Sequence, residues 1–483
     1  MTERPVRHFN ALLVFFLNLL QSRSIFVSGS ISLYLDIQLM KSAGLRCKHG
    51  NLETITNNLR NEFVRIAIIG GGAAGFFGAI SAATHAPEAD IVLYEATQKP
   101  LAKVRISGGG RCNVTHHCFD PAELCKNYPR GARELRGPFS RFQPRDTVEW
   151  FEEHGVRLKS ESDGRMFPVS DDSETIVSCL IQVAKEKNIN IQTGARIRDV
   201  FPQKDRKGGR AFIVTLNDGR EAEYDKVLVA TGSAKQGYRF AEALGHGIVP
   251  CVPSLFTFKV ADSRLHDLAG VSFNNVSLVL NLISKTGAER VFKQSGPLLI
   301  THWGLSGPAV LKLSAWGARE LYDNHYTADL TVNFLPRHNE RDLLEIIRAR
   351  KNSHPKKHVS SDNQFASDAI PNRYWKRIAE ISGADERTTW ASITGATISM
   401  LIAELRQAQF VVRGKGIFKD EFVTCGGVKL SEVDFRTMQS KTCPGLFFAG
   451  EILDIDGITG GFNFQNAWTT GWLAGSAIAS EAR

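Results

Sequence analysis

Apolar and polar residues follow a recognisable order near the start of the folded part of the chain. Apolar residues at 66, 68 and 69 predict a strand, and a second apolar run, 91–94, predicts another. Between them lie a glycine-rich turn and the small-residue run 78–83, whose composition suits a helix. The order strand, turn, helix, strand ends on an acid, Glu95, and is typical of a dinucleotide-binding fold.

The glycine turn has the spacing of a phosphate-binding loop. Gly70 allows the sharp turn off the strand, Gly72 leaves a pyrophosphate room against the backbone, and Gly75 lets the helix approach the sheet. The helix N-terminus offers free N–H groups and a positive dipole end to phosphates. Glu95 can accept hydrogen bonds from both ribose hydroxyls, which favours FAD or NAD over NADP. The predicted nucleotide-binding residues of this segment are Gly70, Gly72, Ala73, Ala74, Gly75 and Glu95.

The pattern changes twice farther along the chain. Two amphipathic segments, 146–154 and 173–188, predict helices. From residue 189 the period becomes two, and the turn 217–219, Asn-Asp-Gly, predicts a hairpin. Residues 251–335 then read as β-rich and 338–412 as helical, with a loose polar loop near 351–363. Neither segment has the strand, glycine turn, helix and strand order of residues 66–95, so we expect them to form an inserted domain.

Two predicted strands end on residues suited to a cofactor. The buried run 226–230 is followed by Thr231 and Gly232, a turn suited to a sheet edge beneath a ligand. The run 445–449 is closed by Gly450 and Glu451. Gly460 and Gly461 then precede a predicted helix at 463–479, a second helix N-terminus. A carboxylate at a strand end and a second helix start are typical of FAD proteins, and they favour FAD over NAD.

Composition narrows the class of protein. With 483 residues, 43% hydrophobic and 23% charged, the chain has the content of a soluble protein of two or three domains. A net charge of +9 is spread along the chain, so we expect a small-molecule substrate, no nucleic acid partner and no membrane partner. Eight cysteines without a C-x-x-C pair favour a reducing cytoplasm. The apolar run 11–20 is too short to cross a bilayer, and we expect 1–62 to be a non-structural extension.

Two clusters invite sharper functional interpretations. Cys112, His116, His117, Cys118 and Cys125 have spacings that fit no common zinc module, so we expect no metal. Aromatic residues could wall a flavin ring, but core packing is the usual role of aromatics at helical spacing. The aromatic residues concerned are Trp303, Phe462, Phe464 and Trp468.

Five blocks of the sequence resemble, in order, a known family. They are ISGGGRCNVTH, VLVATGS, THWGLSGPAVLKLSA, TCGGVKLSEVD and GLFFAGEILDIDGITGGFNFQNAWTTGWLAG. This is the family of bacterial NAD(P)/FAD-dependent oxidoreductases often labelled aminoacetone-oxidase-like, which includes a bile-acid pathway reductase. The resemblance implies an α/β fold: a glutathione-reductase-like, FAD-binding Rossmann domain split by an inserted β-rich and helical domain. The expected limits are 1–62 for the extension, 63–250 and 416–483 for the FAD-binding domain, and 251–415 for the insertion.

The resemblance also implies roles for individual residues. It places Lys103, Ser107, Gly108, Arg111 and Asn113 in a loop along FAD, Glu451 at the ribityl or phosphate region, and Gly461, Phe462 and Asn463 near the flavin ring. We add Thr231, Gly232 and Gly450 from the strand ends. The sequence departs from the family pattern at His116, where Asn is common, and at Cys425, where a small residue is usual.

The expected function is that of an FAD-dependent oxidoreductase. The resemblance implies NAD(P)H as the electron donor and a small organic substrate or oxygen as the acceptor. His302 is a candidate general acid or substrate hydrogen-bond donor, and a structural role is about as well supported. Two alternatives stay open, an FAD-dependent RNA-modifying enzyme and a non-catalytic FAD-binding regulator. The sequence leaves the oligomeric state open.

Overall fold

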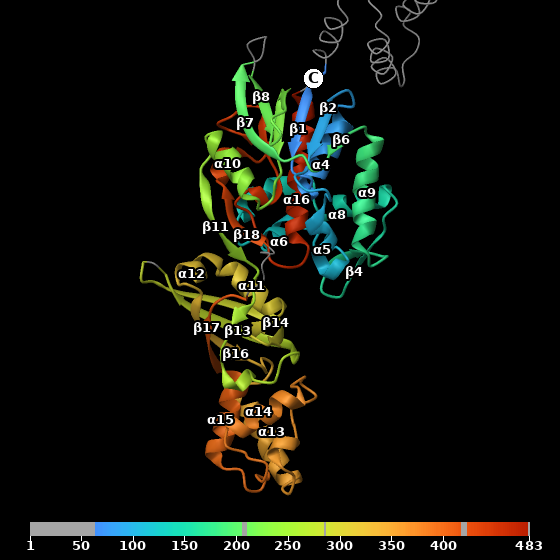
Figure 1. Ribbon diagram of the computed structural model, residues 1–483. Helices are drawn as coiled ribbons and strands as arrows, with labels where there is room; N and C mark the ends of the chain where they lie inside the picture. Colours follow the sequence, from blue (N-terminus) through green and yellow to red (C-terminus); the bar gives the residue numbers. More distant parts are fainter. Residues whose placement is uncertain (1–62, 205–209, 285, 417–422, 482–483) are drawn as a thin grey trace, which may run out of the picture. The chain divides into compact units, whose positions relative to one another are not determined.

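The structure is a computed structural model that describes residues 63–204, 210–284, 286–416 and 423–481 (Figure 1). From Val64 on, they belong to one compact unit, Val64–Arg483. The predicted extension 1–62 lies outside the described residues.

The predicted strand at 66–69 lies in the middle of the largest sheet. It is β1 (Arg65–Ile69), which pairs in parallel with β2 (Asp90–Tyr94) on one side and β10 (Lys226–Val229) on the other. Ile66 and Ile68 have no exposed surface, as a strand covered on both faces requires. The seven strands lie in the order β19 (Val433–Asp434), β20 (Gln439–Ser440), β21 (Leu446–Phe448), β10, β1, β2 and β6 (Asn190–Gln192).

Two helices pack closely because both carry glycines at their contact. They are α4 (Ala73–His85), which follows the glycine turn, and α16 (Phe462–Ser480), which ends the described chain. A Cβ atom added to Gly475 would lie 2.2 Å from the carbonyl oxygen of Gly78, and one added to Gly471 would lie 2.6 Å from that of Ala74. The first and last helices of the described residues are thereby held backbone to backbone (Figure 1).

Further helices and two small sheets complete this part of the molecule. The hairpin predicted around residues 217–219 joins β8 (Arg210–Leu216) to β9 (Glu221–Tyr224), and Gly219 has φ +89°. The other helices are α5 (Ala102–Gly110), α6 (Pro121–Cys125), α7 (Ala132–Phe139), α8 (Pro144–Glu153), α9 (Ser173–Glu186) and α10 (Lys235–Ala243). The remaining strands are β3 (Thr115–His116), β4 (Leu158–Ser160), β5 (Arg165–Pro168) and β7 (Ile197–Lys204).

The segment expected to be β-rich contains a six-stranded sheet and also two helices that the sequence pattern did not predict. These are α11 (Pro308–Trp316) and α12 (Ala318–Asp323). The segment expected to be helical ends in a strand, β17 (Ala408–Arg413), so that prediction was wrong over its last residues. The sheet order is β12 (Phe258–Lys259), β15 (Gly304–Ser306), β14 (Glu289–Thr301), β13 (Ser272–Ile283), β16 (Thr327–Asn333) and β17.

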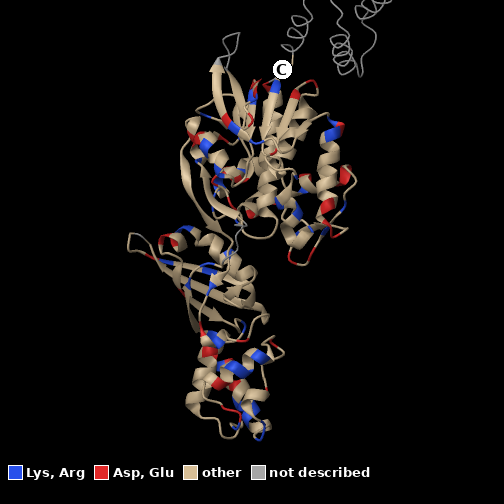
Figure 2. Cartoon of the chain, viewed as in Figure 1, with Lys and Arg blue, Asp and Glu red and all other residues tan. Residues whose placement is uncertain are grey.

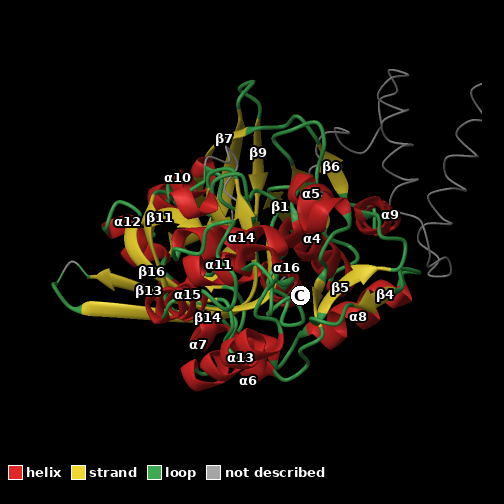
Figure 3. Cartoon of the chain, turned by 90° about the horizontal axis from the view of Figure 1, so that it is seen from below, coloured by secondary structure: helices red, strands yellow, loops and turns green. Residues whose placement is uncertain are grey.

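Three helices form a group beside this sheet (Figure 1; Figure 3 shows all helices in red, seen from below), and their apolar side chains share its core. They are α13 (Glu340–Ser353), α14 (Asn372–Ile381) and α15 (Gly395–Arg406). The ring of Tyr374 lies 5.0 Å from Phe273 of β13 and 4.6 Å from Phe334. This core is separate from the one around the seven-stranded sheet.

The two parts are connected by a pair of antiparallel strands. The chain leaves the seven-stranded part along β11 (Ile248–Ser254) and returns along β18 (Val423–Val428). Val252, Cys425 and Ala318 of α12 form a small cluster beside this pair. The predicted limits of the insertion, 251 and 415, fall within β11 and shortly before β18. Of the helices in the described residues, none combines the length and apolar character needed to cross a membrane.

Candidate functional site

The turn between β1 and α4 has the geometry that a phosphate-binding loop requires. Gly70 has φ +114°, and a Cβ atom there would lie 2.4 Å from the carbonyl oxygen of Ala230. At Gly75 a Cβ atom would lie 1.9 Å from the carbonyl oxygen of Gly70. At Gly72 it would meet nothing within 4 Å, and no side chain caps the helix at this residue. The N-terminus of α4 therefore faces open space with its N–H groups uncapped.

Glu95 lies beside this turn, at the end of β2. Its Oε2 accepts a hydrogen bond from the backbone N–H of Gly71 at 2.9 Å. Its Oε1 accepts from the backbone N–H and the hydroxyl of Thr97, at 2.8 and 2.7 Å. These bonds fix the carboxylate next to the glycine turn, and Oε2, which accepts a single bond, keeps room for a further donor such as a ribose hydroxyl.

The end of β21 meets the start of α4. Gly450 has φ +76°, and a Cβ atom there would lie 2.8 Å from the Cβ of Ala74. Its N–H donates to the hydroxyl of Thr470 at 2.9 Å. The strand end predicted to hold the ribityl chain is thus in contact with the helix predicted to hold the pyrophosphate.

Lys103 and Glu451 form an ion pair although 348 residues separate them. The Nζ of Lys103 lies 2.5 Å from Oε2 of Glu451 and donates to the hydroxyl of Ser233 at 3.0 Å. Oε1 of Glu451 accepts from the backbone N–H of Thr424 at 3.1 Å. A Cβ atom at Gly232 would lie 3.5 Å from Glu451 Oε2, so the two predicted strand ends are neighbours.

Thr231 carries an unsatisfied hydroxyl in this cluster. Its Oγ1 is buried and has no hydrogen-bond partner among the described residues. A Cβ atom added to Gly237 of α10 would lie 1.8 Å from this oxygen, so the hydroxyl points at α10. The backbone of Thr231 is what lies beside the glycine turn, because a Cβ atom at Gly70 would lie 3.0 Å from the Cα of Thr231.

The loop from Leu101 to Asn113 links the two ends of the site. Leu101, Gly108, Gly109 and Cys112 all have left-handed backbone angles, with φ between 58° and 70°. Asn113 closes the loop: in the amide orientation that pairs both of its atoms, it donates to Thr115 O at 3.1 Å and accepts from the N–H of Gly461 at 3.0 Å. Ser107 lies at the kink in α5, and its hydroxyl donates to Val104 O at 3.0 Å.

The start of α16 is shaped by a second glycine turn. Gly461 has φ +93°, and a Cβ atom there would lie 2.4 Å from Thr115 O. Phe462 stacks on His116 with ring centroids 4.7 Å apart, and its carbonyl accepts from the hydroxyl of Tyr128 at 2.6 Å. Both amide atoms of Asn463 bond the backbone of Gly457 at 2.8 Å. Asn463 therefore shapes the turn with its amide already paired.

Two predicted residues are not brought to this cluster. Arg111 points to Glu161, with 2.7 Å from its Nη1 to the carboxylate, and its guanidinium lies 4.0 Å from the ring centroid of Phe167. His302 is exposed in the turn between β14 and β15, and it makes no hydrogen bond or ion pair with any described residue.

Among the aromatic residues considered for a wall beside the flavin, Trp468 is fully buried and donates its indole N–H to Val114 O, which is a core role.

His116 and Cys112 occupy positions beside the site. The ring of His116 donates from Nε2 to Asp163 O at 3.1 Å, while its Nδ1 is buried without a partner in the described part of the chain. Burial lowers the pKa of His116, and nearby Lys312 of α11 lowers it further. Burial raises the pKa of the Cys112 thiol to about 12, which disfavours a reactive thiolate. In the described residues, no three His, Cys, Asp or Glu side chains are placed to hold a metal.

Sequence reasoning missed the residues that position these loops. Tyr128, Ser233 and Thr470 each bond a predicted site residue. Tyr128 lies outside the five blocks, and Ser233 and Thr470 lie inside two of them, but nothing in the sequence showed which residues they would bond. The cluster fits FAD on two grounds: the open space at Gly72, and the glycines at Gly70, Gly450 and Gly461, where a side chain would clash.

Comparison with known proteins agrees with this geometry. The family model described as "HI0933-like protein Rossmann domain" matches residues 64–477. The 3-dehydro-bile acid delta(4,6)-reductase of Clostridium scindens is 29% identical over 423 residues, which cover 86% of this chain and 99% of that protein. The ribosomal RNA dihydrouridine synthase of Escherichia coli is 30% identical over 417 residues, which cover 84% of this chain and 95% of that protein. That of Haemophilus influenzae is 27% identical over 435 residues, covering 87% and 100%.

The match spans both strand-end loops, the glycine turn and the inserted segment. It confirms the resemblance and the fold class expected from the sequence, and it supports FAD as the cofactor. The chain therefore belongs to the HI0933-like Rossmann family and is a flavin-dependent oxidoreductase.

Proposed function

We propose that this protein uses FAD, reduced by NAD(P)H, to add two hydrogens across a carbon–carbon double bond conjugated to a carbonyl group. The relatives are named for two reactions that have the same chemistry. A delta(4,6)-reductase of a 3-dehydro bile acid acts on double bonds conjugated to a ketone. A dihydrouridine synthase saturates the uracil double bond, which is conjugated to a ring carbonyl. A bile acid and a uracil base differ in most respects, but both contain a carbon–carbon double bond conjugated to a carbonyl group.

The residues of the cluster have distinct parts in the proposal. Gly70, Gly72 and the N-terminus of α4 would hold the diphosphate, and Glu95 the adenosine ribose. Lys103, the backbone of Thr231 and Glu451 would contact the middle of the cofactor, and the N-terminus of α16 at Gly461 would face the flavin. When bound, FAD supplies the two-electron chemistry between donor and acceptor.

The acceptor has two candidate classes. A small unsaturated ketone is favoured by the bile-acid relative, and a uracil base in RNA by the two ribosomal RNA relatives. Oxygen would compete with either acceptor, so the experiment must exclude it.

Anaerobic spectroscopy tests the proposal. The purified holoprotein is mixed with NADH and, separately, with NADPH, and the visible flavin band is followed. We expect one nicotinamide to bleach the band, and an unsaturated ketone or a uridine-containing RNA to restore it, with product mass increased by two hydrogens. A saturated ketone is the matched control. A band that neither nicotinamide bleaches contradicts the proposal and favours a non-catalytic FAD-binding regulator.

A further inference from the structure

A short basic segment lies in the helical group of the insertion. It runs from residue 348 to 358, RARKNSHPKKH, and we call it the basic arm. It carries five Lys or Arg residues and two His residues, and no acid lies between Glu345 and Asp362. The chain's net charge of +9 is spread widely, but in this segment five cationic side chains lie within eleven residues, so that one polyanion could contact several of them. Figure 2 shows blue segments on this helical group, with red ones interspersed.

The arm is an ordered structure, although the sequence pattern predicted a loose loop. It starts in the last turns of α13 and ends before a short 3₁₀ turn, Val359–Ser361. Its backbone is bonded from outside: Trp390 N–H donates to Lys357 O at 2.9 Å, and Ala391 N–H to Pro355 O at 2.8 Å. A backbone held this way presents its side chains in a fixed arrangement.

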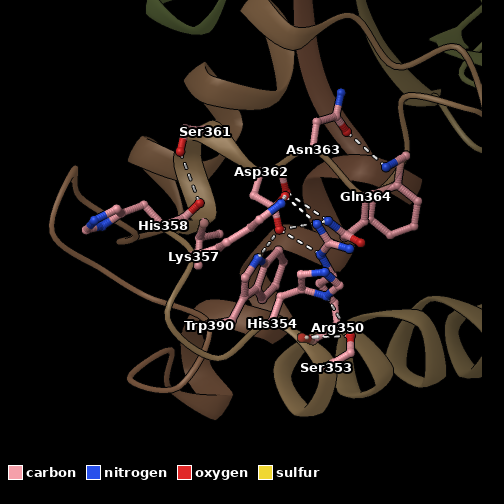
Figure 4. A network of polar contacts seen from close by, with 12 residues as sticks. Arg350, Ser353, His354, Lys357, His358, Ser361, Asp362, Asn363, Gln364 and Trp390 are labelled. Atoms are coloured by element: carbon pink, nitrogen blue, oxygen red, sulfur yellow. Dashed lines mark hydrogen bonds and ion pairs between the residues drawn. The ribbon is translucent and has the colours of Figure 1, made fainter.

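A single carboxylate clamps the arm (Figure 4). Asp362 Oδ2 accepts from Arg350 Nε at 2.7 Å and from the indole N–H of Trp390 at 2.8 Å, and Lys357 Nζ lies 3.4 Å from Oδ1. The Arg350 hydrogen bonds are the largest reason why the pKa of Asp362 falls to about 2. The Asp362 carboxylate therefore stays ionised, and its oxygens are already occupied by Arg350, Trp390 and Lys357.

The clamp leaves other cations of the arm available. Arg348 and Lys356 are exposed, and neither makes a hydrogen bond or ion pair with a described residue. The Lys357 side chain is 55% exposed despite its contact with Asp362. The acid in contact with the arm is already shared among Arg350, Lys357 and Trp390, so it offers little to neutralise Arg348 and Lys356.

We infer that the basic arm binds the phosphates of an RNA substrate, so that the acceptor is a base within an RNA chain. This rests on the proposed function, and of its two acceptor classes only RNA carries repeated negative charges. The arm belongs to helices packed into the core of the insertion, and it contributes nothing to the core beneath the FAD loops. A small molecule held at those loops has no use for these cations, whereas a long polyanion can contact both regions.

Binding of a labelled, uridine-containing single-stranded RNA to the holoprotein tests the inference. Fluorescence anisotropy is measured at several salt concentrations for the wild type and for the double variant Arg348→Gln, Lys356→Gln. We expect affinity at low salt to fall about tenfold, and the slope of log K against log salt to shrink by about 1.4, at roughly 0.7 per lost phosphate contact. The matched control is Arg290→Gln, Lys293→Gln on β14, where both cations are likewise exposed and unpaired among described residues. It should bind like the wild type.

Three results would overturn the inference: unchanged affinity in the arm variant, an equal loss in the control, or equal arm-dependent binding of single-stranded DNA or anionic lipid vesicles. Flavin bleaching by the nicotinamide is recorded on the same preparations. If bleaching and reduction of an unsaturated ketone persist but the arm variant binds RNA normally, the inference fails and the proposed function stands. If the wild type is not bleached at all, the proposed function itself fails.

Discussion

Arg130 holds the carboxylate of Asp456, which has no exposed surface, with two of its guanidinium nitrogens. Nε lies 2.5 Å from Oδ1, and Nη2 contacts Oδ2. Ser254, at the end of β11, donates to Oδ2 at 2.7 Å, and Nη1 of Arg130 donates to Ala315 O of α11 at 2.7 Å. One ion pair therefore joins the turn before α16, the connection to the insertion and the first helix of that insertion.

Removing one partner of this pair should destabilise the fold strongly. Asp456→Leu leaves Arg130 charged and without its carboxylate in a buried site, and we expect a loss of about 3–5 kcal/mol in the free energy of unfolding. Urea unfolding followed by tryptophan fluorescence measures it.

The double variant Arg130→Met, Asp456→Leu is the control for this pair. It removes both charges at once, so it should recover most of the stability lost in Asp456→Leu. If the double variant loses as much stability as Asp456→Leu and the single variant Arg130→Met lose together, the two residues do not act as a pair.

Gly72→Val should abolish FAD binding without unfolding the protein. A Cβ atom at Gly72 meets no protein atom within 4 Å, and the residue's φ is −92°, so the fold accepts a side chain there. The same side chain would occupy the space predicted for the pyrophosphate. We expect FAD to be lost on gel filtration while the circular dichroism spectrum is unchanged. Gly395→Val, at an equally open helix start, should keep its FAD.

Thr231→Val tests whether the hydroxyl of Thr231 takes any part in cofactor binding. The hydroxyl points at α10 and has no partner among the described residues, so its removal should leave the apoprotein's melting temperature unchanged or raised. FAD affinity should stay close to that of the wild type, whereas a lost hydrogen bond of about 1 kcal/mol would weaken it about fivefold. Titration of apoprotein with FAD, read by flavin fluorescence, gives the affinity. A fivefold loss would contradict this assignment.

His116 should make stability depend on pH. Burial lowers the pKa of His116 below its usual 6.5, so the folded protein keeps this ring neutral while the unfolded chain takes up a proton. The stability from the neutral ring is therefore present above about pH 6.5 and is lost as the pH falls below it. Melting temperatures between about pH 7.5 and 5.5 should fall less steeply in His116→Asn than in the wild type. The exposed His302→Asn serves as control and should follow the wild type.

The parts of the fold with strong local signals could be predicted from the sequence. The alternation before Gly70 and the glycine spacing specify β1, the turn and α4. By contrast, the apolar segment that forms α11 is only nine residues long and follows directly on strands. A segment so short does not show whether its apolar residues repeat with the period of a helix or of a strand. The strand β17 was missed because α15 ends just before it and no Pro or Gly marks the change.

The glycine turns of the candidate site were predictable from the sequence. Gly70 and Gly461 stand where a side chain would clash with the backbone, whereas Gly72 follows from the motif spacing alone, because a side chain there would meet no described protein atom. The pairing of Lys103 with Glu451 could not be predicted, since each looks like any other charged residue along the chain. The clamp at Asp362 had no signal either, because the loop around it is polar and the role of Trp390 depends on the fold.

The antiparallel pairing of β11 with β18 makes the entrance and the exit of the insertion adjacent, at Ile248 opposite Val428 and Ser254 opposite Val423. Because the two ends of the segment meet, a substitute that begins and ends on such a strand pair can rejoin the chain without separating the strands of the seven-stranded sheet. Such a substitute must also supply a carbonyl where Ala315 O accepts from Arg130. Recombination at this junction would therefore exchange the six-stranded sheet and its three helices in a single step.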